Sequence, residues 1–212
     1  QGNQSPRYHV KAQTFEEAER LGYILGERVV AAIDKLDDSD FNDKLDIFAT
    51  SAFIDSVRKL PMSLEEADKN LIFWQNEFER LKIENAGHGP IRSAECSVFG
   101  AEEALFIAKC AADGVLDKAL ESYKKLEVQV IRIGECYMVG LAGELFVEYS
   151  LAIKEQVDGQ VFVLCCTNGE AQGYIVTDGA TGYEADNAFF APATGAAMVE
   201  KAVELIAGMG RK

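Results

Sequence analysis

The chain has 212 residues, of which 35 are acidic and 21 basic, so its formal net charge at pH 7 is −14. This balance argues against binding to nucleic acid or to anionic membrane surfaces, since both require clustered lysine and arginine. A hydrophobic fraction of 48% is ample for a buried core. The length suits one domain, or one large half of a two-part fold.

Histidine is scarce, and the cysteines do not form a pairing pattern. His9 and His88 are the only two histidines, whereas a catalytic zinc site takes about three protein ligands. The five cysteines are odd in number and have no C-x-x-C spacing, which indicates reduced and mostly buried thiols. Unpaired thiols favour a cytoplasmic compartment. No apolar run reaches the roughly 18 residues of a membrane span.

A helix is expected first. Thr14 followed by Glu17 has the spacing of a capping box, and apolar residues then recur at helical spacing over residues 18–36. Residues 37–40 (DDSD) lack the glycine and the terminal glutamate of an EF-hand, so they predict an exposed acidic loop rather than a calcium site.

A strand and a second helix follow. Residues 46–60 predict a strand, ended by Pro61. Ser63 with Glu66 repeats the capping-box spacing and predicts a helix that continues towards Ile83.

The apolar period changes in the middle of the chain. Residues 86–90 (AGHGP) predict a loop, and residues from about 100 to 126 predict two shorter helices broken at Asp113-Gly114. Residues 127–133 and 136–141 alternate as strands around a tight turn, which predicts a hairpin.

The last third predicts a helix over about 144–155, a buried strand over 160–166 and an irregular, glycine-rich stretch over 167–193. A C-terminal helix over 194–207 is closed by Gly208. The whole chain therefore predicts a single mixed α/β unit, strands with packed helices, whose irregular loops lie near its two ends.

Three segments carry residue types suited to catalysis or metal binding, and the first is at the N-terminus. Ser5 lies close in sequence to Arg7 and His9, and a serine beside such groups is either a nucleophile or proton donor, or part of a simple Ser-Pro turn.

The second segment is 141–146 (LAGELF), where a glycine precedes Glu144. This carboxylate either interacts with a helix dipole or serves as a metal ligand or acid/base at a strand-to-helix junction. The third segment is 168–175 (NGEAQGYI), with 182–184 (GYE) after it. It follows a strand where α/β folds usually place ligands, so its tyrosines either bind a ligand or pack.

Two weaker candidates remain. His88, between two glycines, is either a ligand or a solvent-exposed side chain. Cys165-Cys166 ends an apolar strand, which favours core packing over a nucleophile or a vicinal disulfide.

The three segments, in this order, resemble motifs of the neutral/alkaline (non-lysosomal) ceramidase family and its bacterial relatives. Residues 2–6 (GNQSP) resemble the family's Gly-Asp/Asn-x-Ser-Pro, and residues 143–146 (GELF) resemble its Gly-Glu-Phe. Residues 168–177 are similar to its Asn-x-Tyr-x-x-Tyr-Ile/Val-Thr-Thr segment, and 182–184 resemble the Tyr-Glu that follows. The resemblance extends from residue 1 to about 206.

The resemblance implies a zinc-dependent hydrolysis of an N-acyl amide, with roles for four residues. It places Ser5 at the reaction centre, as nucleophile or to orient the attacking water. Glu144 and Tyr174 are implied zinc ligands, and Tyr183 is implied to stabilise the oxyanion. His9 matches no family ligand.

Departures from the family pattern bear on substrate and completeness. Glu170 replaces an aromatic residue, and the stretch between Tyr174 and Tyr183 is shorter than in the ceramidases, which disfavours a long-chain ceramide. The family's two zinc-binding histidines precede the Ser-Pro motif, outside this chain. We therefore expect the C-terminal half of a zinc-hydrolase-like catalytic domain, completed by an N-terminal half or a partner chain. The alternatives are a hydrolase of a smaller amide or ester, and a non-catalytic scaffold or interaction domain that retains the fold.

Overall fold

The structure is a computed structural model that describes residues 1–6, 9–169, 171 and 173–210. Its helices are α1 (Phe15–Ile33), α2 (Leu64–Ile83), α3 (His88–Ala112), α4 (Val115–Ala119), α5 (Val147–Gln156), α6 (Tyr183–Asp186) and α7 (Pro192–Gly208), with 3-10 turns η1 (Asp38–Asp40) and η2 (Leu120–Tyr123). Its strands are β1 (Ile47–Asp55), β2 (Lys125–Ile133), β3 (Cys136–Leu141), β4 (Glu144–Leu145), β5 (Gln160–Leu164) and β6 (Tyr174–Ile175). The mixed α/β class is confirmed.

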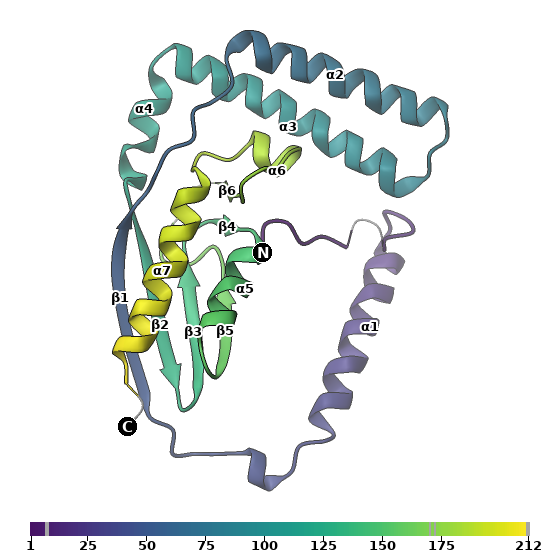
Figure 1. The fold of residues 1–212 in the computed structure, drawn as a ribbon. Helices are drawn as coiled ribbons and strands as arrows, with labels where there is room; N and C mark the ends of the chain where they lie inside the picture. Colours follow the sequence, from purple (N-terminus) through teal and green to yellow (C-terminus); the bar gives the residue numbers. More distant parts are fainter. Residues whose placement is uncertain (7–8, 170, 172, 211–212) are drawn as a thin grey trace.

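A four-stranded sheet in the order β1-β2-β3-β5 forms the body of the molecule (Figure 1). The predicted hairpin is confirmed as the antiparallel pair β2–β3, and β1 adds to it antiparallel. β5 pairs parallel with β3 after the crossover through α5. A separate two-stranded sheet joins β4 and β6 in parallel.

The core lies between this sheet and the helices α5 and α7, which cover one face of it (Figure 1). Alternate residues of β2, among them Val128 and Val130, are fully buried under these helices, as the period of a strand requires. The opposite face is open. Phe53 of β1 and Phe162 of β5 are 61% and 56% exposed there, so this face carries apolar surface that the described residues leave uncovered.

Helices α2 and α3 pack together as a pair above the carboxyl end of β3 (Figure 1). The capping box of α2 is confirmed, because Ser63 and Glu66 each accept a hydrogen bond from the other's backbone N–H. The expected loop over 86–90 is wrong in part. α3 already begins at His88, since Gly87 turns the chain with a φ of 87° and Pro90 falls in the first turn, where its missing N–H costs nothing.

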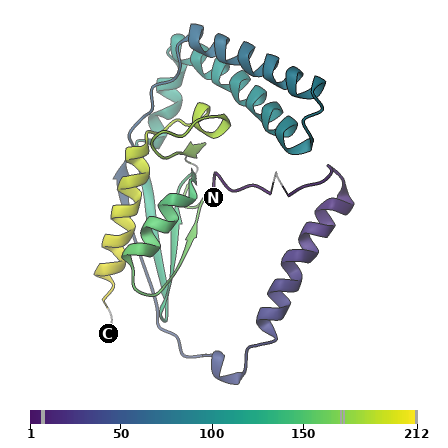
Figure 2. The ribbon, with the colours of Figure 1, turned by 45° about the vertical axis from the view of Figure 1, so that its right-hand side comes forward.

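Helix α1 is confirmed, yet it projects away from the body of the molecule (Figures 1 and 2). Only half of its capping box forms: Thr14 accepts from the Glu17 N–H, whereas the buried Glu17 carboxylate accepts from Lys11 N and Arg20. The large apolar side chains exposed on α1 are Phe15, Tyr23, Ile24, Leu25, Val29, Val30 and Ile33. The apolar face expected from the sequence is therefore solvent-exposed in this chain.

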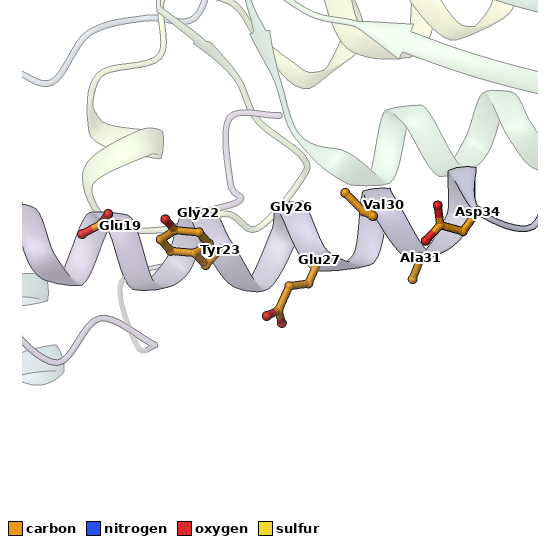
Figure 3. Close-up of a pocket in the computed structure, with 8 residues that line it drawn as sticks. All are labelled: Glu19, Gly22, Tyr23, Gly26, Glu27, Val30, Ala31 and Asp34. Atoms are coloured by element: carbon orange, nitrogen blue, oxygen red, sulfur yellow. The ribbon is translucent and has the colours of Figure 1, made fainter.

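A hollow on α1 is lined only by residues of that helix and its C-cap, including Gly22, Tyr23 and Gly26 (Figure 3). It is the gap left on the helix surface by two glycines one turn apart, and it lies away from the predicted functional segments.

No helix in the described part of the chain combines the length and the apolarity that crossing a membrane requires.

Several expectations for the last third of the chain are wrong. Glu144 belongs to strand β4 and not to a helical turn, because α5 begins only at Val147; the helix-dipole interpretation of Glu144 is therefore wrong. β5 ends at Leu164 and is a half-exposed edge strand, with Cys166 exposed beyond it rather than packed in the core.

The C-terminal helix begins two residues earlier than expected, with Pro192 in its first turn, and includes Gly208. The acidic segment over 37–40 is exposed, as predicted.

Candidate functional site

Glu144 and Tyr174 lie opposite each other in adjacent strands. β4 and β6 pair in parallel with Glu144 in register with Tyr174. Two glycines at positive φ, Gly143 (86°) and Gly173 (79°), turn the chain into these short strands, and Glu144 N donates to Gly173 O over 3.1 Å. Because in-register neighbours in a parallel sheet point to the same side, the two side chains share one face, with backbones about 4.8 Å apart.

Tyr183 joins this pair from helix α6. The rings of Tyr174 and Tyr183 meet edge to face, with centroids 5.8 Å apart and an interplanar angle of 72°. A side-chain hydrogen bond also joins Tyr174 and Tyr183. Burial, together with the nearby Glu144 carboxylate and Tyr183, raises the pKa of Tyr174 well above its usual range. Burial also raises the pKa of Tyr183, so both phenols are neutral at pH 7.

The position of α6 is set by a glycine in α3. A Cβ added at Gly100 would lie 2.6 Å from Tyr183 Cδ2 and 2.9 Å from Asn187 Nδ2. Gly100 thus lets α6 approach the α3 backbone, and the buried Asn187 donates to Tyr183 O over 2.8 Å. Sequence reasoning did not single out Gly100; a glycine inside a long helix, which costs about 1 kcal/mol relative to alanine, was the available signal.

The N-terminal segment docks against the same strands. Gly2 N donates to Leu145 O over 2.8 Å, and Asn3 bridges the start of α5 by accepting from Val147 N (2.8 Å) and donating to Glu148 (2.9 Å). Asn3 thereby satisfies a first-turn N–H that the N-cap residue of α5 leaves without a side-chain partner.

Gly2 has no room for a side chain. An added Cβ would lie 2.5 Å from Glu144 O and 2.9 Å from Tyr174 Cδ1. The Gly-Asn dipeptide of the N-terminal motif therefore has a physical role, since it brings residues 1–6 against the Glu144–Tyr174 pair. In the sequence, Gly2 and Asn3 are visible only as part of a motif, because the strands that they contact lie far along the chain.

Ser5 lies just beyond that contact. It lines a cavity of about 280 Å³ between the N-terminal segment and α3, together with Arg92 and Cys96. Cys96 lies one helical turn before Gly100 and close enough to Tyr183 to act on its titration, so the cavity adjoins the tyrosines. His88 also lines this cavity, at the first residue of α3. Arg7 and Glu170 lie outside the described residues.

The structure thus brings Glu144, Tyr174 and Tyr183 into one site, with Ser5 in the adjoining cavity. Among the described residues, no group of three or more His, Cys, Asp or Glu side chains could hold a metal ion. The donors that fit zinc are two oxygens, the Glu144 carboxylate and the Tyr174 phenol, so further ligands would have to come from another polypeptide segment. To bind zinc as a phenolate, Tyr174 would have to give up its phenolic proton.

Comparisons of the chain with protein-family models, with curated proteins and with solved structures found no match. The likeness to the ceramidases consequently depends on the short motifs in residues 2–6, 143–146 and 168–184.

Proposed function

We propose that this chain is one part of a zinc-dependent amidohydrolase that resembles the neutral ceramidases and cleaves an N-acyl amide. The observation that carries the proposal is the register of β4 and β6. Glu144 and Tyr174, which are 30 positions apart in the sequence, lie opposite each other, with Tyr183 against Tyr174. A fold that had kept these residues only for packing would have no need to place a carboxylate beside two half-buried phenols.

The residues have complementary roles in amide hydrolysis. The carbonyl carbon gains a bond to the oxygen of water or of Ser5, and the C–N bond breaks as the nitrogen takes a proton; when Ser5 is the nucleophile, water then releases the acyl group. Tyr183 would donate its proton in a hydrogen bond to the oxyanion, a contribution worth about a hundredfold or more in rate. Zinc, held in part by Glu144 and Tyr174, would polarise the carbonyl and lower the pKa of a bound water to about 7.

A partner polypeptide segment is part of the proposal, because two oxygen donors do not complete a zinc site. The open face of the sheet, with Phe53 and Phe162 exposed, and the exposed apolar side chains of α1 support it. Exposed apolar side chains grouped on one face often mark an interaction surface. That segment, an N-terminal half of the domain or a separate chain, would contribute the two further histidine ligands.

Two alternatives remain as proposals. A smaller amide or ester substrate is favoured by the short stretch between Tyr174 and Tyr183. A non-catalytic scaffold or interaction domain is favoured by the same open apolar surfaces, since they would serve an interaction domain equally well.

The test is the zinc content of two preparations, measured by atomic emission. One is this chain alone, and the other is the chain translated together with its upstream coding sequence. We expect about one zinc per molecule and amide hydrolysis only in the second, with zinc affinity reduced by Glu144→Gln but not by Glu135→Gln in the β2–β3 turn. Stoichiometric zinc bound by the chain alone through His9 and His88 would refute this division of the site.

A further inference from the structure

The cavity beside Ser5 has a lining that distinguishes it from the rest of this acidic molecule. It lies between the N-terminal segment and the first turns of α3, and the described residues that line it are Ser5, Pro6, Val10, Gln13, His88, Arg92 and Cys96. None of them is a carboxylate, although the chain has 35 Asp and Glu residues. The hollow on α1, by contrast, is lined by Glu19, Glu27 and Asp34.

Two nitrogen donors share one side of this cavity. His88 and Arg92 are four residues apart in α3, so their side chains lie on the same face, one turn from each other. Arg92 Nη1 donates to Glu95, which holds the guanidinium from the adjoining turn. A guanidinium has five N–H donors in a planar fork, and imidazole donates in either protonation state, so the pair suits a planar anion.

The distance from this pair to the tyrosines limits the size of a ligand. At 1.5 Å per residue, Arg92 lies about 12 Å from Gly100 along the axis of α3, and Gly100 is in contact with Tyr183. A molecule whose carboxylate meets Arg92 and whose amide meets Tyr183 would therefore keep these two groups within roughly 12 Å of each other.

We propose that this cavity binds the carboxylate of an N-acyl amino acid or a short N-acyl peptide, with Arg92 as the principal binding residue and His88 as a second donor. The assignment of that molecule as a substrate rests on the proposed amide hydrolysis. The recognition of the carboxylate does not, because it depends on α3 and the N-terminal segment alone.

The test measures binding without hydrolysis, by NMR titration of the complete chain with N-acetylglycine and with its uncharged counterpart N-acetylglycinamide. We expect N-acetylglycine to bind more tightly and to shift the side-chain signals of His88 and Arg92. In Arg92→Gln we expect its affinity to fall about tenfold or more. The matched control is Arg80→Gln, which removes an arginine paired with Glu77 and Glu84 on α2 and should leave the affinity unchanged.

Equal affinities for the two probes would overturn the proposal, and so would unchanged affinity for N-acetylglycine in Arg92→Gln. Circular dichroism of that variant checks that α3 persists without the Arg92–Glu95 pair, and His88→Gln offers a second variant that leaves the pair intact. Binding that persists while zinc and hydrolysis fail would count against the proposed enzyme and not against the carboxylate site.

Discussion

Gly100→Ala tests whether α6 and Tyr183 are positioned by contact with α3. The added Cβ would lie 2.6 Å from Tyr183 Cδ2, 2.9 Å from Asn187 Nδ2 and 3.2 Å from Tyr183 Cα. The last of these atoms belongs to the backbone, so a rotation of the tyrosine ring does not remove the clash. Helix α6 itself has to move by a few tenths of an ångström.

The expected loss follows from two opposing terms. Alanine in place of glycine inside a helix stabilises by about 1 kcal/mol. Overpacking a site of this kind costs about 1–3 kcal/mol. The net change at Gly100 is therefore a loss of about 0–2 kcal/mol. Gly22→Ala in α1 has the same helix-propensity gain with nothing within 4 Å of the new Cβ, so the two variants should differ by about 1–3 kcal/mol.

The measurement is urea unfolding of both variants, combined with the aromatic NMR signals of Tyr183. We expect Gly22→Ala to be at least as stable as the unmodified chain, and Gly100→Ala to be less stable than Gly22→Ala with displaced Tyr183 signals. Equal stability of the two variants, with Tyr183 signals unmoved, would refute the argument that Gly100 sets the position of α6.

Two further predictions concern the core and α1. Burial, with Asp178 and Glu148 nearby, raises the pKa of Tyr149 to about 12, so the stabilisation by its neutral phenol should be complete below pH 10 and lost as the pH rises from 10 to 12. The free energy of unfolding, measured from pH 10 to pH 12, should show this loss in the unmodified chain but not in Tyr149→Phe. Val29→Glu should change the free energy of unfolding by less than about 0.5 kcal/mol, because Val29 is exposed on α1, whereas a loss above about 1 kcal/mol would show that α1 packs on the body.

Local features of the fold could be predicted from the sequence because they depend on neighbours in the chain. The capping box of Ser63 and Glu66, the break at Asp113-Gly114 and the β2–β3 hairpin all depend on interactions within a few residues, and all are confirmed. The predicted helix boundaries are wrong where a glycine or a distant partner determines the end of the helix. The start of α3 at His88 depends on the positive φ of Gly87.

The candidate site also has features that the sequence predicts and features that only distant contacts determine. Motif order singled out Ser5, Glu144, Tyr174 and Tyr183, but periodicity put Glu144 in a helix, since a two-residue strand has too few positions to show a pattern. Only the pairing of β4 with β6 places Glu144 opposite Tyr174.

By itself, the sequence determined the acidic surface, the mixed α/β class and the helices and hairpin whose stabilising contacts are local. Tertiary structure alone decided which of those elements meet. It left the apolar face of α1 and one face of the sheet exposed, and it brought Gly2, Tyr174 and Tyr183 together from opposite ends of the chain. The physical reason is that such contacts depend on the packing of whole elements and on close approaches at Gly2 and Gly100, which residue type and spacing do not encode.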